Sequence, residues 1–255
     1  MEISLAHITS SILVIGLRVS GLMLFAPFFS NASIPPRIKA ILVIAITAVL
    51  YPVYSPHLQS VTMSDWPVLV ASETVVGIGM GVATNIVFEA ALMAGQILSV
   101  QMGYSLVNIL DPTTQVENTV IAFLHQSVAM LIFLGLDVHH WILRAVANSF
   151  EYLPPGSAAL NPHFVQALLH EGAIVLELGI QIAAPVLSAT LLADIVLGLL
   201  GKASPQMPLM LLGPAVKSML GVFVLGITMR FWPHLFAQYF SESIVYTERL
   251  LRLAR

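Results

Sequence analysis

Cysteine is absent from this chain of 255 residues, which removes several kinds of chemistry at once. Disulfide bonds, thiolate metal sites and cysteine nucleophiles are all excluded. The fold must therefore be stabilised by the packing of side chains and by partners, and not by covalent cross-links.

Charged residues are also scarce. Asp, Glu, Lys and Arg make up 9% of the chain, whereas soluble domains carry about a quarter, and hydrophobic residues make up 58%. The mean hydropathy is +0.91. The formal net charge is -3 and no basic tract is interleaved with aromatic residues, so the sequence excludes nucleic acid as a partner.

Positive charge is missing from the start of the chain, where Glu2 is the only early charge and Arg18 lies inside an apolar run. A cleaved signal peptide needs positive charge before its apolar core. We therefore expect the N-terminus to be retained.

Long apolar blocks take up most of the sequence, and most of them reach the length that an α-helix needs to cross hydrocarbon. They indicate an all-α membrane protein with about six hydrophobic helices, in one integral membrane domain over residues 1–255. A final segment after Pro233 has the pattern of an interfacial amphipathic helix. The six blocks are Ile8 to Phe29, Ile38 to Tyr54, Val68 to Ala94, Val120 to Leu136, Gly172 to Leu200 and Leu209 to Trp232.

The distribution of Lys and Arg conflicts with six simple spans. If the N-terminus lies outside, Arg37, Lys39 and Lys202 fall inside as the positive-inside rule requires, but the basic residues of the C-terminal tail fall outside. The reverse orientation places the first three on the wrong side. Some hydrophobic helices are therefore expected to pack against protein instead of spanning lipid independently.

Several apolar blocks contain ionisable residues, and each costs roughly 2.5 kcal/mol or more at mid-bilayer unless it is paired or hydrated. Two interpretations stand: the charges pair within an assembly, or they form the ion relay of a secondary transporter, with Glu73, Glu177 and Asp194 as its acids. We predict assembly charge pairs drawn from Arg18, Glu73, Glu89, Glu177, Asp194, Lys202 and Lys217.

Three further residues are predicted to shape the helices. Gly77 and Gly81 form a small-xxx-small pair that lets another helix approach closely. Pro185 removes one backbone hydrogen bond and is expected to kink its helix.

Two short motifs resemble catalytic or metal sites only weakly. Gly103-Tyr104-Ser105 contains the G-x-S of a serine nucleophile, but a packed helical segment explains it better. His139 and His140 are adjacent, so on a helix they should point apart, and no ligand at i+4 completes a set. We predict no catalytic, metal or cofactor site.

Between Gly95 and Asn118 the chain is amphiphilic, and its part from about Leu106 to Thr119 is too polar to face lipid and too apolar for an idle surface loop. Such a backbone is tolerated at membrane depth only when it is buried in protein or lines an aqueous cavity.

The landmarks along the chain, taken in order, resemble the FliR family of type III export-gate subunits. The resemblance covers nearly the whole chain. Its landmarks are Arg18, Pro27-Phe28, Ile34-Pro35 with Arg37 and Lys39, Glu73 with Gly77 and Gly81, Ala91 to Gln96, Gln101-Met102-Gly103, Asp111-Pro112, Asp137 to Trp141, Leu153 to Gly156, Ala184-Pro185, Asp194, Gly198, Lys202, Pro205-Gln206-Met207 and Gly213-Pro214 with Lys217.

The resemblance implies a structural and conducting role without bond-making chemistry. One copy of this chain would join FliP and FliQ in a hetero-oligomeric gate in the bacterial inner membrane, within the flagellar basal body. FlhB and FlhA would lie nearby, membrane lipid would surround the gate, and unfolded flagellar proteins would pass through it. Residues from about 1 to 160 would be FliP-like and those from about 161 to 255 FliQ-like, folded as kinked helical hairpins.

The resemblance also implies that the segment marked by Asp111-Pro112 supplies a plug that fills the closed pore. The alternative is a loop that links two helices and packs against FliP. An injectisome gate subunit and a self-contained transporter remain alternative functions for the chain. The predicted plug residues are Val107, Asn108, Ile109, Leu110, Asp111, Pro112, Gln115 and Val116.

Overall fold

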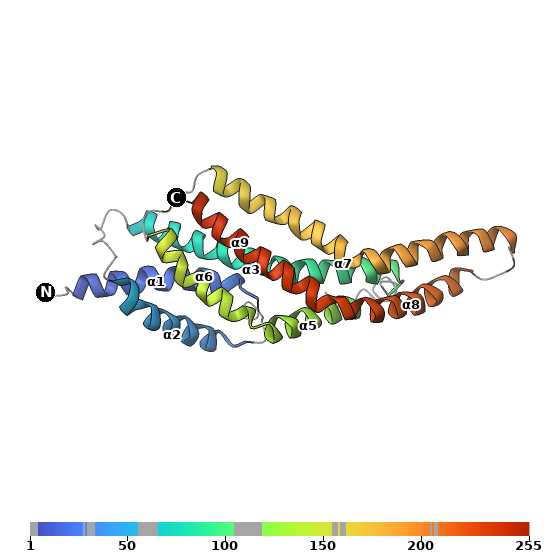
Figure 1. Ribbon diagram of the computed structural model, residues 1–255, viewed down its shortest axis with the longest axis horizontal. Helices are drawn as coiled ribbons and strands as arrows, with labels where there is room; N and C mark the ends of the chain where they lie inside the picture. The colour runs from blue at the N-terminus through green and yellow to red at the C-terminus, as the bar shows by residue number, and fades with distance from the viewer. Residues whose placement is uncertain are drawn as a thin grey trace. The chain divides into compact units, whose positions relative to one another are not determined.

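The computed structural model describes residues 5–27, 29, 34–55, 66–104, 119–154, 158, 162–204, 206 and 209–254. Within these ranges every regular element is a helix, so the expected all-α fold is confirmed. The predicted plug lies outside them. The helices, shown in Figure 1, are α1 (Leu5–Phe25), α2 (Pro36–Tyr54), α3 (Trp66–Gln101), α5 (Val120–Gly135), α6 (Val138–Tyr152), α7 (Pro162–Ala203), α8 (Leu209–Thr228), the short 3-10 helix η2 (Met229–Phe231) and α9 (Trp232–Leu253).

Two helices are longer than their apolar blocks. α3 extends seven residues past Ala94, and α7 begins ten residues before Gly172. Among the described residues, five helices are long and apolar enough to cross a membrane, or six if α5 and α6 form one broken span. This agrees with the expected number of hydrophobic helices.

Local sequence explains where several helices begin and end. Pro36 occupies the first turn of α2, where a missing N–H costs nothing. The Thr119 side chain accepts a hydrogen bond from the Ala122 N–H and so caps α5. Gly103, two residues beyond the end of α3, has a φ of +86° that suits glycine. The Tyr104 N–H bonds to the Ser99 carbonyl at 2.9 Å, which completes a Schellman motif.

The chain divides into two compact units, each built from segments distant in sequence. Unit 1 comprises Met1–Ile86, Asp137–Gly172 and Phe240–Arg255. Unit 2 comprises Val87–Leu136 and Ala173–Tyr239. The chain passes between the units within α3, α7 and α9 and at the joint between α5 and α6.

Each unit has its own apolar core. In unit 1, Ile15 and Leu22 of α1 and Met80 of α3 are fully or almost fully buried. In unit 2, the Phe88 and Phe133 rings meet edge to face with their centroids 5.4 Å apart. These cores fix the helices that hold the charged residues described below.

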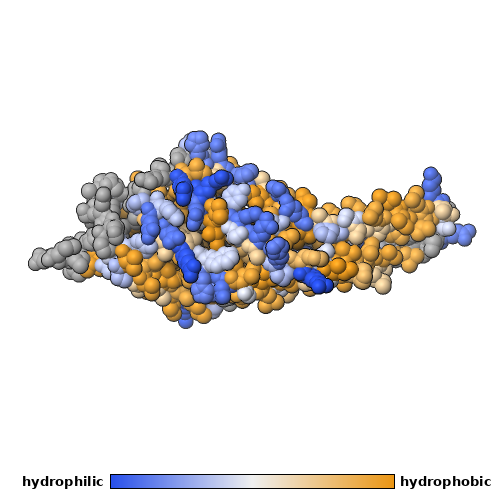
Figure 2. All heavy atoms as spheres, in the orientation of Figure 1, coloured by the Kyte–Doolittle hydropathy of each residue, from blue (hydrophilic) through white to orange (hydrophobic). Residues whose placement is uncertain are grey.

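Large apolar surfaces stay exposed on both units. α2 in unit 1 exposes Ile41, Ile44 and Val49. Figure 2 shows hydrophobic residues over α8 and the neighbouring part of α7 in unit 2, where Leu192 and Phe223 are exposed. Because soluble monomers rarely expose apolar patches of this extent, lipid or another protein must cover them.

Candidate functional site

A buried charged network ties three helices of unit 1 together. The Arg18 Nε of α1 donates to the Glu73 Oε2 of α3 at 2.7 Å, and both side chains are 0% exposed. The Arg18 Nη1 donates to the Ser149 carbonyl of α6 and to the carbonyl of Leu153, the residue after α6, each at 3.0 Å. The guanidinium also lies 4.4 Å from the centre of the Phe150 ring. The Arg18 guanidinium is therefore held by the Glu73 carboxylate and by carbonyl groups at the C-terminal end of α6, where the helix dipole favours a cation.

Close packing of glycines brings α1 against α3 beside this network. A Cβ added to Gly77 would lie 2.3 Å from the Arg18 carbonyl oxygen, and one added to Gly81 would lie 2.7 Å from the Leu22 carbonyl oxygen. Gly21 on α1 faces Thr74 equally closely. Any side chain at these positions would push the helices apart. Sequence reasoning singled out the two glycines of α3 and missed Gly21.

A second network joins three helices of unit 2. The Asp194 Oδ1 of α7 lies 3.0 Å from the Lys217 Nζ of α8, and the Asp194 Oδ2 accepts from the Gln101 Nε2 of α3 at 2.8 Å. The Asp194 side chain is 40% exposed and that of Lys217 is 18% exposed. Because water screens a pair this accessible, it contributes much less than a dry one.

The other predicted charges lie elsewhere. Glu89 and Lys202 are exposed, and Lys202 occupies the last turn of α7, where a cation is favoured. Glu177 is exposed and accepts a hydrogen bond from the Gln181 side chain at 3.2 Å. The structure thus joins two pairs among the seven predicted charges, and their role in assembly stays a prediction.

Pro185 lies inside α7, which continues unbroken on both sides of it. The kink expected at Pro185 stays a prediction. Gly103, which sequence analysis placed in a weak nucleophile motif, has a structural task. It ends α3 and packs against Pro214, and the neighbouring Tyr104 hydroxyl accepts from the Ser218 hydroxyl at 2.6 Å. Ser105 lies outside the described residues.

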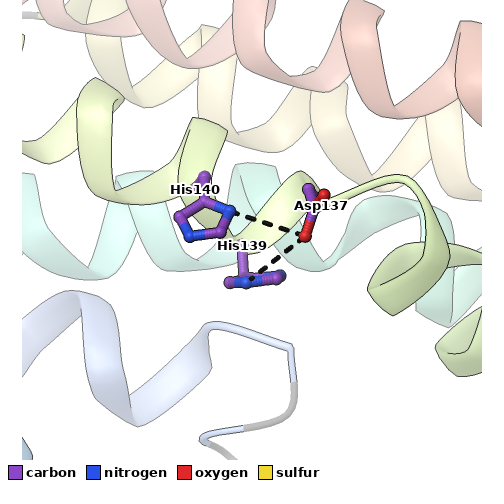
Figure 3. Close-up of side chains that lie close together, drawn as sticks. All are labelled: Asp137, His139 and His140. Atoms are coloured by element: carbon purple, nitrogen blue, oxygen red, sulfur yellow. Dashed lines mark ion pairs between the residues drawn. The ribbon is translucent and has the colours of Figure 1, made fainter.

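Asp137, His139 and His140 gather at the start of α6 (Figure 3). Their nearest oxygen and nitrogen atoms are 3.8 Å apart for His139 and 3.6 Å apart for His140, and the two rings are 4.1 Å apart. The expectation that the histidines point apart is therefore wrong. Asp137 adopts a left-handed conformation with φ of 55°, and both rings lean back toward its carboxylate in the first turn.

The chemistry of this cluster is limited. Three potential ligand atoms lie within 4.8 Å of one another, which is close to the spacing that a transition metal needs. Asp137 and His140 are nevertheless exposed, and the two contacts between histidine and carboxylate explain the arrangement by themselves. The cluster is a polar start to α6, and we assign it no ligand.

The sequence did not predict the hydrogen-bond acceptors of Arg18 other than Glu73. The Ser149 and Leu153 carbonyls are backbone groups, so no residue type marks them in advance. Glu171 was also missed. It is buried, and both its carboxylate oxygens are without a hydrogen-bond partner in the described part of the chain. Glu171 directly precedes the apolar block that begins at Gly172, and an acidic residue at the edge of such a block does not by itself indicate a site.

Comparison with known proteins gives a consistent result. The family model for bacterial export proteins, family 1, matches residues 9–243. The flagellar biosynthetic protein FliR of Escherichia coli (strain K12) is 29% identical over 236 residues, which cover 88% of each chain. FliR of Bacillus subtilis (strain 168) is 24% identical over 98% of both chains. The secretion system apparatus protein SsaT of Salmonella typhimurium is 28% identical over 180 residues, 70% of this chain and 68% of its own.

Proposed function

The chain belongs to the bacterial export proteins, family 1, and on this basis we propose that it is a structural and conducting subunit of a flagellar type III protein export gate. The observation that carries the proposal is the family match over residues 9–243. Flagellar biosynthetic proteins similar to almost the whole chain support the flagellar system. The resemblance inferred from the ordered motifs is thereby confirmed.

The geometry supports a subunit that works inside an assembly. The exposed apolar residues of α2 and α8 need a covering of lipid or protein, as Val49 and Phe223 illustrate. A buried network holds α1, α3 and α6 in a fixed arrangement. Rigid helices with apolar outer faces suit packing between neighbouring subunits in a membrane.

Family membership shows that the chain has partners in an export apparatus, and it supports a finer proposal about which proteins these are. The chain is a component of an export apparatus with partners in that apparatus. The finer proposal is one copy of this chain with FliP and FliQ, with FlhB and FlhA nearby, in the bacterial inner membrane at the flagellar basal body. Unfolded flagellar proteins would be conducted through this gate, and the chain itself would make or break no bonds.

The internal division proposed from the sequence receives support from helix lengths. α7 begins at Pro162, close to the proposed boundary at about residue 160. From there the chain forms one long arm, Pro162–Ala203, and a second, Leu212–Leu253, of 42 residues each. We keep the proposal that residues from about 161 to 255 are the FliQ-like part. The plug proposal for residues 107–116 rests on the sequence alone.

A second function is favoured by one observation. The similarity to SsaT, a secretion system apparatus protein, supports an injectisome gate subunit as the alternative. The transporter alternative has no such support. Glu73 is held by a buried Arg18, and Asp194 by Lys217 and Gln101, so both acids already have partners.

Deletion of the gene, combined with affinity purification of the tagged chain, tests the proposal. We expect loss of filament export and of swimming in the deletion strain, and recovery of FliP and FliQ with the tagged protein. A stable monomer that recovers neither partner and is dispensable for filament export would refute it. Loss of effector secretion with normal swimming would favour the injectisome.

A further inference from the structure

A cleft of about 520 Å³ lies between the first turns of α7 and the last turns of α9, both within unit 1. These segments run side by side in Figure 1, the start of α7 in yellow and the end of α9 in red. α7 contributes His163, His170 and Glu171 at the spacing of one helix face, and α9 contributes Arg249 and Leu250. This set is called the α7–α9 cleft below.

Glu171 is the unexplained residue of the α7–α9 cleft. It is 2% exposed, and neither Oε1 nor Oε2 has a hydrogen-bond partner among the residues that the structure describes. A buried carboxylate without a partner is unfavourable when ionised. A cation that enters the cleft would remove this penalty.

Arg249 supplies the opposite charge at the rim. It is exposed, and no ion pair joins it to Glu171 or to any other acid in the described ranges. The cleft therefore offers a carboxylate inside and a guanidinium outside, with Leu250 and Ala167 as apolar walls. A simple cation would satisfy Glu171 and leave Arg249 unused. A zwitterion with a leading cation followed by an anion satisfies both.

The length of α7 places this cleft near a membrane surface. A helix of 42 residues is about 63 Å long, roughly twice the 30 Å of a hydrocarbon core. Its first ten residues include His163, Gln166 and His170, and its remaining part is strongly apolar. Figure 2 shows hydrophilic residues gathered over the start of α7 and the last turns of α9. These polar turns belong at the depth of lipid headgroups.

We propose that the α7–α9 cleft binds the headgroup of an aminophospholipid. The primary ammonium of the headgroup donates hydrogen bonds to Glu171, and the phosphate, two carbons away, faces Arg249 at the rim. Leu250 and Leu253 contact the first carbons beyond the phosphate. Each charged end of the ligand thus meets a group that has no partner of opposite charge among the described residues.

Titration of phospholipids onto the full chain in detergent, read by native mass spectrometry, tests this assignment. The probes are phosphatidylethanolamine, phosphatidylglycerol, which lacks the ammonium, and phosphatidylcholine, whose quaternary ammonium donates no hydrogen bond. Wild type should prefer phosphatidylethanolamine. Glu171→Gln should weaken that binding about ten- to a hundredfold while leaving phosphatidylglycerol unchanged. Arg249→Gln should weaken both, because it removes the phosphate contact.

The midpoint of thermal unfolding, measured for wild type and both variants with and without lipid, is a second test that does not depend on mass spectrometry. Without lipid, Glu171→Gln should unfold at or above the wild-type temperature, because it removes a buried carboxyl group that has no hydrogen-bond partner among the described residues. Added phosphatidylethanolamine should raise the midpoint of wild type more than that of Glu171→Gln, because stabilisation of the folded state grows with the affinity of the ligand for it.

Four results would overturn the proposal. The first is equal binding of the three lipids to wild type, and the second is an unchanged preference of Glu171→Gln for phosphatidylethanolamine. A fall in midpoint of equal size for Glu171→Gln and Arg249→Gln without lipid would mean that the two side chains pair within the chain. Unchanged lipid selectivity together with poor recovery of the complex by Glu171→Gln would assign the cation to a partner polypeptide.

Discussion

Removing Glu73 should destabilise the protein far more than removing Asp194, although both acids face a basic side chain at about 3 Å. The difference lies in burial. Glu73→Ala leaves the Arg18 guanidinium fully buried without a counter-charge. Asp194→Ala leaves a lysine that water reaches.

The magnitudes follow from this contrast. Breaking a buried pair costs about 3–5 kcal/mol, and Arg18 keeps its two carbonyl contacts with α6, so we expect a loss of about 3 kcal/mol for Glu73→Ala. An accessible pair contributes less than about 1 kcal/mol, which bounds the loss for Asp194→Ala. The two variants should therefore differ by about 2 kcal/mol or more, roughly thirtyfold in the unfolding equilibrium.

The assay is equilibrium unfolding of the full chain in mixed micelles, with helix content as the signal. Recovery of the export complex gives a second readout, and it should fall more for Glu73→Ala than for Asp194→Ala. The double variant Arg18→Met with Glu73→Leu is the control for burial. It should regain at least half of the loss, because a buried pair replaced by apolar residues of similar size leaves no bare charge.

Equal losses for the two single variants, within about 0.5 kcal/mol, would refute the claim that burial decides the strength of these pairs. Normal recovery of the complex with blocked export in Glu73→Ala would point to a relay or gating role for the acid. A double variant less stable than Glu73→Ala would mean that the contacts of Arg18 with α6 matter more than its charge.

Further perturbations address the glycine contact, the proline and the proposed plug. Gly77→Ala should cost about 1–3 kcal/mol in unfolding free energy because its Cβ meets the Arg18 carbonyl at 2.3 Å, whereas Gly172→Ala, with open space around it, should be neutral or stabilising; equal effects would contradict the packing argument. Pro185→Ala should restore a backbone hydrogen bond and alter secretion through the gate, and wild-type swimming by a stably expressed variant would show that the proline is dispensable. Deleting Ile109 to Glu117 should leave assembly intact and let small ions leak through cells that express the complete gate, and unchanged permeability in an assembled variant would end the plug proposal.

Composition and the length of the apolar blocks were enough to predict the helical fold. The ends of α3 and α7 were not predictable in this way, because polar residues there stay helical through tertiary contacts. Gln101, for example, ends α3 while its side chain bonds to Asp194 of α7. A hydropathy pattern predicts that the helix ends before such a polar residue. The partner that keeps the residue in the helix is known only from the folded structure.

The sequence predicted that buried charges would pair, but it did not predict which residues pair with one another. An arginine and a glutamate in apolar blocks each indicate that a partner exists. They do not identify it, since Arg18 and Glu73 are 55 residues apart and the remaining acceptors of Arg18 are backbone carbonyls. The prediction that the two histidines point apart was wrong for a local reason, because both side chains lie near the carboxylate of Asp137, the residue before α6, whose φ is 55°.

The contacts of Arg18 also set a condition on biosynthesis. The ribosome makes Arg18 55 residues before Glu73 and 131 residues before Ser149. At roughly 5–20 residues per second, about 7 to 26 s separate the first helix from the helix whose carbonyls receive its guanidinium. During that interval a lone arginine at the centre of a lipid-embedded helix costs about 2.5–3.5 kcal/mol. We therefore expect the first helix to take up its final position only after α6 has been translated.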